Sequence, residues 1–251
     1  MSKKILITGA SSGFGKAMAY RFANAGWNLV ITGRRADRLN EMAVDLKKTY
    51  KVEVSVKVFD VQNRDEVFSA LSGDSNLNDL DVLVNNAGLA LGRDYFDEAS
   101  LDDWETMIDT NLKGLLYVSK AVLPYFINNG KGHIINIGST AGKEVYEKGN
   151  VYCATKTSVE AISQAMRIDM LRHQIKVTAI HPGAAETEFS IVRFKGDEAT
   201  AKTVYDGYQP LKAEDVADTA FYCANLPEHV CVNSLVMTCT SQANSFYLLR
   251  K

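Results

Sequence analysis

Hydrophobic positions along this chain fall into two alternating patterns. Short runs rich in Val, Ile and Leu predict about seven strands, at residues 4–8, 28–32, 52–59, 81–84, 133–137, 176–180 and 233–238. Longer stretches with helical periodicity predict helices at residues 13–25, after the second strand up to residue 48, at 101–128 with an interruption near 109–111, at 150–173 and at 213–224. This alternation predicts an α/β fold, a doubly wound parallel sheet with helices on both faces.

No linker divides this pattern, so residues 1–251 are expected to form a single domain. Ligands of such sheets bind at the carboxyl ends of the strands. Residues 184–211 follow the sixth strand and lack strand character. We therefore expect them to form a mobile lid over a substrate at that edge of the sheet.

Composition narrows the class of protein. The chain has 28 Lys and Arg residues against 30 Asp and Glu residues, and nucleic-acid partners usually require a basic excess. No apolar run approaches the ~20 residues that span a bilayer, and the first one is too short for a secretion signal. The four cysteines form no CxxC pair and no zinc spacing. We expect a reduced, cytoplasmic protein with no metal site, no nucleic-acid partner and no membrane association.

A glycine-rich turn joins the first predicted strand to the first predicted helix. Its sequence, Thr-Gly-Ala-Ser-Ser-Gly-Phe-Gly, covers residues 8–15 and contains Gly9, Gly13 and Gly15. Glycine permits a tight turn and lets backbone N–H groups approach a pyrophosphate at the N-terminus of a helix. The turn favours a dinucleotide site, although a strand–helix turn without a ligand has the same pattern.

Two arginines follow the second predicted strand. Dinucleotide folds usually place an acidic residue there to bind the ribose 2′-hydroxyl, whereas this chain has Gly33, Arg34 and Arg35. A guanidinium can grip a 2′-phosphate with two hydrogen bonds. The pair predicts NADP rather than NAD. The alternative is that both arginines are solvated residues at the start of a charged helix.

Two further motifs fall at the ends of predicted strands, and a third lies on the predicted helix that follows. Asn-Asn-Ala-Gly occupies residues 85–88, Gly-Ser-Thr-Ala-Gly occupies residues 138–142, and Tyr152 lies four residues before Lys156 on the following helix. Residues four apart on a helix share a face, so Tyr152 and Lys156 point the same way. Each motif alone could be a turn, a cap or a surface pair, but their order and placement favour a common site.

With these motifs, the chain resembles the short-chain dehydrogenase/reductase family over about residues 4–240. The family pattern TGxxxGxG is met at residues 8–15, NNAG at 85–88 and YxxxK at 152–156. The resemblance implies a single-domain Rossmann fold, an NADP-dependent oxidoreductase that acts on a CH–OH group, and a homotetramer or homodimer formed through the long helix.

The resemblance also assigns site residues. It implies that Asp60 contacts the adenine and that the loop with Pro182, Gly183 and Thr187 closes over the nicotinamide carboxamide. The implied catalytic residues are Asn111, Ser139, Tyr152 and Lys156. The implied cofactor-binding residues are Gly9, Ser11, Ser12, Gly13, Phe14, Gly15, Arg34, Arg35, Asp60, Val61, Asn86, Tyr152, Lys156, Pro182, Gly183 and Thr187.

The chemistry of carbonyl reduction gives these residues their expected roles. Free tyrosine has a pKa of about 10, and a nearby Lys156 ammonium is expected to lower the pKa of Tyr152, the general acid/base. The resemblance gives Lys156 a second role in holding the nicotinamide ribose. We expect the Ser139 hydroxyl to hydrogen-bond the substrate oxygen. Asn111 lies in a predicted helical stretch although Asn is a poor helix former. Either its side chain has a specific partner, or the helix is simply interrupted at this position. The family uses this Asn to position a water that relays protons to Lys156.

One subgroup of the family resembles the chain further, at residues 85–92, 103–110, 132–142 and 188–196. It contains the NADP-dependent 3-hydroxy acid dehydrogenases of serine and allo-threonine type. Arg193 and Lys195 are the candidate cations for a substrate carboxylate, although both could be surface or subunit-contact residues. Residues 143–149 depart from the subgroup beside the predicted active site.

Two other functions remain open from the sequence. The same residues could serve a reductase of another small ketone, aldehyde or sugar. A non-catalytic NADP-binding protein is disfavoured by the complete set of Asn111, Ser139, Tyr152 and Lys156. Beside this set, Cys153 is interpreted as a packing residue. His181 is interpreted as a strand-end residue, with an effect on the charge of the substrate as the alternative.

Overall fold

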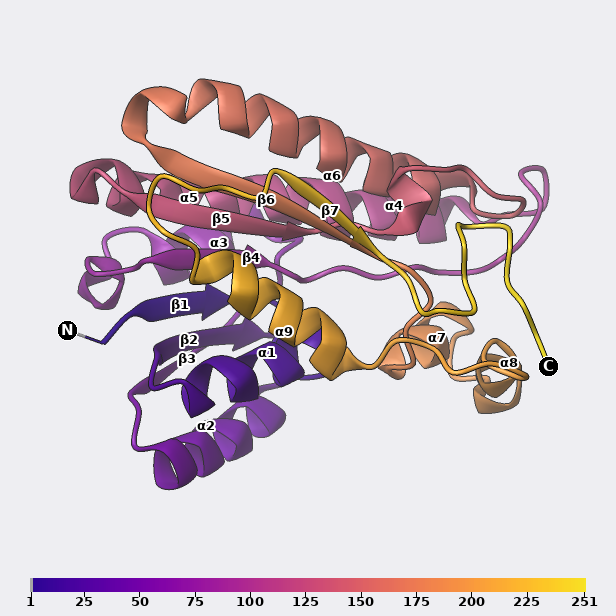
Figure 1. Cartoon of the computed structure of the whole chain (residues 1–251), viewed down its shortest axis with the longest axis horizontal. Coiled ribbons are helices and arrows are strands. Elements are labelled where there is room, and N and C mark those ends of the chain that lie inside the picture. The colour runs from indigo at the N-terminus through magenta and orange to yellow at the C-terminus, as the bar shows by residue number, and fades with distance from the viewer. Residues whose placement is uncertain (1) are drawn as a thin grey trace.

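Seven parallel strands form one sheet in the computed structural model, which describes residues 2–251 (Figure 1). Their order across the sheet is β3-β2-β1-β4-β5-β6-β7. The strands are β1 (Lys4–Ile7), β2 (Asn28–Gly33), β3 (Val54–Val58), β4 (Val82–Asn85), β5 (Gly132–Ile137), β6 (Ile175–Pro182) and β7 (Ser234–Met237). The predicted doubly wound parallel sheet is confirmed.

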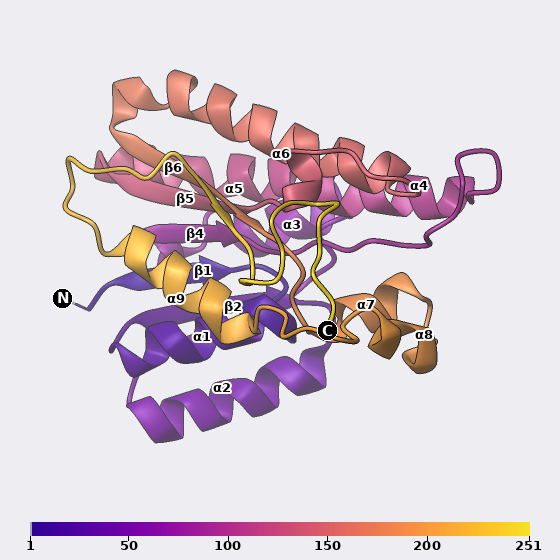
Figure 2. The same ribbon diagram turned by 45° about the vertical axis from the view of Figure 1, so that its right-hand side comes forward.

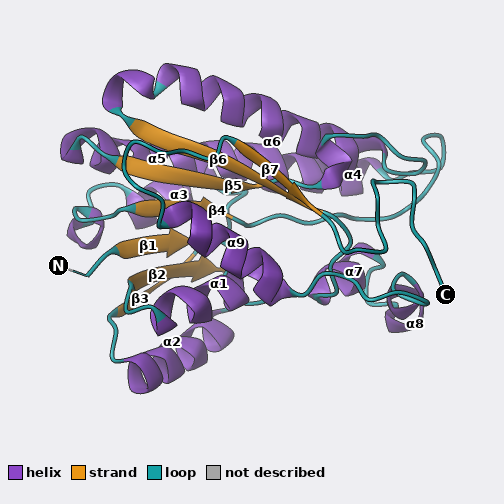
Figure 3. Cartoon of the chain, viewed as in Figure 1, coloured by secondary structure: helices purple, strands orange, loops and turns teal. Residues whose placement is uncertain are grey.

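Helices cover both faces of the sheet, as Figure 3 shows. One layer contains α1 (Gly13–Asn24), α2 (Ala36–Tyr50) and α9 (Ala213–Ala224), and the other contains α3 (Arg64–Leu71), α5 (Leu115–Asn129) and α6 (Asn150–Asp169). Phe22 and Ala220 pack with the strands in the first layer, and Phe126 and Val118 do so in the second. This double coverage explains why the strand sequences are almost continuously apolar.

Some helices differ from the prediction. Helix α3 was not predicted because it is only eight residues long and buries only Val67 and Leu71. The interruption near residues 109–111 is real, but it is a widened π-helical turn (Asp109–Gly114) that joins α4 (Leu101–Ile108) to α5 without a break. The long helix ends at Asp169 rather than at residue 173 and is followed by one 3₁₀ turn.

The segment 184–211 lies at the carboxyl edge of the sheet (Figure 2). It is more regular than predicted, because it contains the short helices α7 (Glu188–Arg193) and α8 (Glu198–Thr203). The C-terminal tail is bonded to it: the Lys251 N–H donates to the Gly207 carbonyl at 2.8 Å, and an Arg250 guanidinium nitrogen donates to the Val204 carbonyl at 3.0 Å. The mobility of this segment stays a prediction.

The strand order also places the expected binding site. Strand β1 lies between β2 and β4, so the chain reverses its direction across the sheet at this point, where open α/β sheets bind ligands. Within residues 2–251, no helix is long and apolar enough to cross a membrane. In the same residues, no three His, Cys, Asp or Glu side chains are grouped to hold a metal ion.

Candidate active site

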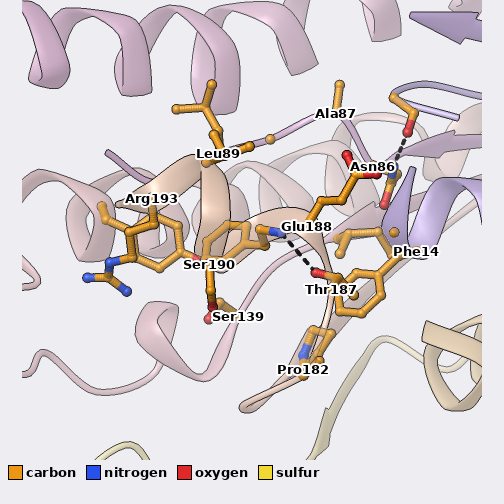
Figure 4. A pocket seen from close by; sticks show the side chains of 18 of the residues that line it. Phe14, Asn86, Ala87, Leu89, Ser139, Pro182, Thr187, Glu188, Ser190 and Arg193 are labelled. Atoms are coloured by element: carbon orange, nitrogen blue, oxygen red, sulfur yellow. Dashed lines mark hydrogen bonds between the residues drawn. The ribbon is translucent and has the colours of Figure 1, made fainter. Parts of the chain in front are cut away.

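A cleft of about 450 Å³ runs along the carboxyl edge of the sheet. Figure 4 shows Phe14 and Asn86 toward one end of this pocket and Arg193 and Ser139 toward the other. The predicted residues that line the cleft are Gly9, Ser11, Ser12, Gly13, Phe14, Arg34, Arg35, Asp60, Val61, Asn86, Ser139, Tyr152, Lys156, Pro182, Gly183, Thr187 and Arg193. Two predicted residues, Gly15 and Asn111, lie behind its wall rather than in it.

The glycine turn forms the first end of the cleft. Gly9 has a φ of +64° and Gly13 a φ of +50°, in the left-handed region that favours glycine. A Cβ on Gly15 would lie 2.4 Å from the Gly9 carbonyl oxygen, so this position also excludes a side chain. The Asn86 amide donates to the Thr8 carbonyl at 2.8 Å and ties the turn to the end of β4. The turn therefore presents backbone and the N-terminus of α1 to the cleft, as an anionic ligand requires.

Arg35 lies beside this turn and begins α2. Its guanidinium donates to the hydroxyls of Ser11 at 3.0 Å and Ser12 at 2.6 Å. It also pairs with Glu188 of α7 at 3.0 Å, and Arg38 pairs with the same carboxylate at 2.9 Å. These cationic side chains hold the pKa of Glu188 below its usual value although burial acts in the opposite direction.

Arg34 and Asp60 face each other across the ends of β2 and β3. A guanidinium nitrogen of Arg34 lies 3.4 Å from an Asp60 carboxylate oxygen. Both side chains line the cleft together with Arg35. The two arginines thus lie at the start of a helix and also line the cleft. Their contact with a 2′-phosphate stays a prediction.

The proposed catalytic residues meet at the middle of the cleft. Tyr152 and Lys156 are buried on one face of α6, and the Lys156 ammonium donates to the Ile137 carbonyl at 3.0 Å. The Lys156 nitrogen lies 5.9 Å from the centre of the Tyr152 ring. Ser139 follows β5 and accepts a hydrogen bond from the Ala141 N–H at 3.1 Å.

The expected pKa of Tyr152 was wrong in direction. Burial, and then Tyr146, raise the pKa of the Tyr152 phenol, although the hydrogen bond with Ser139 and the charge of Arg193 act to lower it. Burial also lowers the pKa of Lys156 to about 8. The physical reason is that α6 buries both groups, so loss of hydration opposes the ionised form of each.

Asn111 has specific partners in the widened turn. Its amide oxygen accepts from the Leu89 N–H at 2.8 Å, and its nitrogen donates to the Leu89 carbonyl at 2.8 Å and to the Thr155 hydroxyl at 3.1 Å. A Cβ on Gly88 would lie 3.1 Å from the Asn111 oxygen and 3.4 Å from the Lys156 nitrogen. Asn111 is therefore more than a helix interruption: it ties Leu89, directly after the NNAG segment, to Thr155 of α6.

Of the two candidate substrate cations, only Arg193 lines the cleft. Its guanidinium donates to the Gly92 carbonyl at 3.2 Å and to the Tyr146 hydroxyl at 3.1 Å. Its central carbon lies 5.6 Å from the centre of the Tyr152 ring. Lys195 instead pairs with Asp103 at 2.8 Å on the surface.

With this geometry, we compared the chain with known proteins. A family profile described as short chain dehydrogenase matches residues 3–197. The chain belongs to this family.

Two relatives are similar to almost the whole chain. Sulfoacetaldehyde reductase 2 of Chromohalobacter salexigens is 46% identical over 249 residues, 98% of each chain. The NADP-dependent 3-hydroxy acid dehydrogenase YdfG of Escherichia coli K12 is 44% identical over 241 residues, 95% of this chain and 96% of the relative. The names of these two relatives thus indicate two different classes of acidic substrate, a sulfonated aldehyde and a 3-hydroxy acid.

Solved structures of short-chain dehydrogenases share the fold over the same length. The closed form of a serine dehydrogenase complexed with NADP⁺ is 43% identical, covers 99% of both chains and has a TM-score of 0.91. An alcohol dehydrogenase of Thermococcus sibiricus complexed with 5-hydroxy-NADP is 28% identical, covers 98% of this chain and all of its own, and has a TM-score of 0.85.

Several cleft residues of this short-chain dehydrogenase were missed from the sequence. Gln242 accepts a hydrogen bond from the Ala184 N–H at 2.8 Å, and the Ser245 N–H donates to Glu144 at 3.1 Å. The Ser245 hydroxyl is buried and has no partner among residues 2–251. Tyr146 lies in the segment 143–149, whose unusual sequence was the available signal. Nothing in the sequence near Gln242 and Ser245 indicates a role, because only the fold returns the C-terminal tail to the cleft.

Proposed function

We propose that this protein is an NADP(H)-dependent oxidoreductase that interconverts a short 3-hydroxy acid and its 3-oxo acid. One observation carries this proposal. The buried Tyr152–Lys156 pair lies in one cleft with Arg193, whose guanidinium is 5.6 Å from the Tyr152 ring. A proton donor for a carbonyl oxygen and a cation for an acidic group thus stand side by side.

The first end of the cleft fits NADP. The glycine turn offers backbone and a helix N-terminus to the pyrophosphate, and Arg34 and Arg35 offer two guanidiniums to the 2′-phosphate. Asp60 and Val61 would flank the adenine, and Pro182, Gly183 and Thr187 would border the nicotinamide. When bound, the nicotinamide supplies or accepts the hydride. The names of the relatives and the NADP-bound structures support this assignment.

Tyr152 would serve as the general acid in the direction of reduction. Its raised pKa keeps the phenol protonated, so it can give its proton to the carbonyl oxygen as hydride reaches the carbon. The Ser139 hydroxyl would donate a hydrogen bond to the same oxygen. Lys156 would stabilise the phenolate that remains, and Asn111 would hold the backbone behind Lys156. Oxidation of the alcohol reverses each of these transfers.

Arg193 would bind the acidic group of the substrate. A guanidinium can donate two hydrogen bonds to a carboxylate, and it can do the same to a sulfonate. A second candidate function is therefore the reduction of a small aldehyde that carries a sulfonate, which the 46% identity to a sulfoacetaldehyde reductase favours. Assembly into a homodimer or homotetramer and a cytoplasmic location stay predictions.

A matched substrate screen tests this proposal. NADPH oxidation would be followed with short 3-oxo acids, sulfoacetaldehyde and neutral carbonyl compounds of the same size. NADP⁺ reduction would be followed with serine, allo-threonine, 3-hydroxybutyrate and neutral alcohols, and both series would be repeated with NADH or NAD⁺. We expect the highest kcat/KM for a 3-hydroxy or 3-oxo acid with the phosphorylated cofactor. Preference for sulfoacetaldehyde would select the second candidate, and preference for neutral substrates would contradict both.

A further inference from the structure

His181 is a buried histidine directly behind the site, and the proposed mechanism does not use it. It is the penultimate residue of β6, and its side chain is fully buried. One ring nitrogen, Nδ1, lies 3.2 Å from the backbone carbonyl oxygen of Ser139. The other, Nε2, lies 2.7 Å from a carboxylate oxygen of Glu160, one helical turn after Lys156 on α6. His181 thus links the residue that holds the substrate oxygen to the helix that carries Tyr152 and Lys156.

Both contacts of His181 are with groups that only accept hydrogen bonds. The Ser139 carbonyl has no proton to give. Glu160 is ionised at neutral pH: burial opposes this, but hydrogen bonds from Gln164, Lys143 and His181 lower its pKa to about 2. A neutral imidazole carries one N–H, whereas the imidazolium carries two. Only the protonated form of His181 can therefore donate to Ser139 and Glu160 at the same time.

The surroundings of His181 define its charge balance. Glu160 approaches from α6, and Lys143, from the loop after β5, lies 3.2 Å from the same Glu160 oxygen. Strand β7 adds the Ser234 hydroxyl, which donates to Glu160 at 3.4 Å, and the loop after β5 adds the Ser139 carbonyl. Burial and the charge of Lys143 lower the pKa of His181 against the opposing effect of Glu160. The imidazolium of His181 thus forms at lower pH than that of a free histidine and gives way to the neutral ring as pH rises.

The packing at the end of β5 requires this contact. A Cβ on Gly138 would lie 2.4 Å from Nδ1 of His181, so the ring fits only because residue 138 is glycine. The Gly138 N–H donates to the Ile180 carbonyl at 2.7 Å and fixes the backbone on the other side. The Ser139 carbonyl oxygen thus has two neighbours that bear on its orientation, the Gly142 N–H, which donates to it at 2.9 Å, and Nδ1 of His181 at 3.2 Å.

We propose that His181 is a positioning residue for Ser139: held by Glu160 as an imidazolium, it donates its second N–H to the Ser139 carbonyl and fixes the backbone that carries the Ser139 hydroxyl. This inference rests on the proposed role of Ser139. In the neutral form of His181, the N–H stays with the ionised Glu160, and a nitrogen lone pair faces the Ser139 carbonyl. The hydroxyl is then held less well for the substrate oxygen.

The protonation of His181 can be measured without any assay of activity. Nitrogen-15 NMR of the histidine rings distinguishes an imidazolium from the two neutral tautomers. We expect the imidazolium of His181 to form as pH falls, with a midpoint below the ordinary value of 6.5. His133 is an internal control, because burial and then Lys176 lower its pKa to about 3 and it should stay neutral. A single neutral tautomer of His181 at every pH from 5 to 8 would overturn the proposal.

Two variants separate the two ring nitrogens. In His181→Asn the amide nitrogen can take the place of Nδ1 and donate to Ser139, whereas in His181→Gln it can take the place of Nε2 and donate only to Glu160. Near pH 5.5 we expect kcat to fall about tenfold in the Gln variant and to be largely retained in the Asn variant, with unchanged affinity for NADPH. The ratio of parent to Gln-variant kcat should shrink as pH rises to 8.

Equal kcat in the parent and both variants at pH 5.5 would overturn the proposal, as would an equal loss in both. If a variant does not fold, the NMR titration of the parent decides. If the protein turns over no acidic carbonyl compound, the proposed function is wrong. The NMR titration would still decide in that case whether His181 donates to Ser139.

Discussion

At one end of the cleft, the Asn86 side-chain amide donates to the backbone carbonyls of Thr8 and Gly9 and joins the glycine turn to the end of the neighbouring strand. At the other end, Arg193, Tyr146 and Ser245 come from three segments that lie far apart in the sequence. The first end needs particular backbone conformations, which short motifs encode. The second needs side chains that different loops deliver, so it can change without disturbing the fold.

The two ends also differ in how they are supported. Strands β1 and β4 are buried on both faces, whereas α7 buries only Ser190 and α8 only Ala201. Segments with few buried contacts open more readily than the core. Arg193 is thus carried by an element with fewer buried residues than the strands that hold the glycine turn, as the predicted lid over a substrate would require.

The largest expected effect lies where the two ends meet. Tyr152→Phe removes the proposed proton donor and leaves the ring in place, so kcat should fall by about 10²–10⁴-fold. NADPH affinity, measured by fluorescence titration, should stay unchanged because the cofactor end is intact. Near-parental turnover by this variant would refute the proposed role of Tyr152.

The cofactor end should respond separately. Replacement of Arg34 and Arg35 by Ala removes the charge-assisted hydrogen bonds to the 2′-phosphate, and NADPH affinity should fall roughly ten- to a hundredfold. NADH affinity, measured in the same titration, is the control and should change little. An unchanged preference for NADPH over NADH would mean that other groups recognise the phosphate.

The substrate end has its own matched pair of variants. Arg193→Ala should lower kcat/KM for an acidic substrate by roughly ten- to a hundredfold and affect a neutral alcohol of similar size far less. Lys195→Ala is the control, because Lys195 pairs with Asp103 outside the cleft. An equal loss of kcat/KM with acidic and neutral substrates would mean that Arg193 stabilises the segment 184–211 and does not bind the acidic group of the substrate.

The smallest expected effect concerns Glu188, which joins the two ends. It begins α7, the helix that carries Arg193, and pairs with Arg35 and Arg38. Glu188→Gln should free Arg35 and tighten NADPH binding by up to about fivefold, since exposed ion pairs contribute up to about 1 kcal/mol. Glu186→Gln alters a nearby exposed acid and should leave the affinity unchanged. Weaker NADPH binding in Glu188→Gln would show that the pair supports the cofactor end instead.

The sequence predicted most of what rests on local patterns. Alternating apolar runs and helical periodicity placed the seven strands and the main helices, because burial on both faces leaves a direct trace in composition. Helix α3 left too weak a trace, with two buried residues in eight. The glycine turn and the Tyr152–Lys156 spacing were predicted because backbone conformation and helix periodicity act over a few residues.

Properties that depend on distant neighbours were decided by the tertiary structure alone. The sequence places a lysine beside Tyr152 and so predicts a lowered pKa, but the fold buries both groups, and lost hydration raises the pKa of the tyrosine. Likewise, the sequence shows His181 only as a residue before a proline. Its contacts with Ser139 and Glu160 arise because parallel strands and a crossover helix bring together residues that are 21 to 42 positions apart in the sequence. Local sequence patterns extend over only a few residues and cannot predict such contacts.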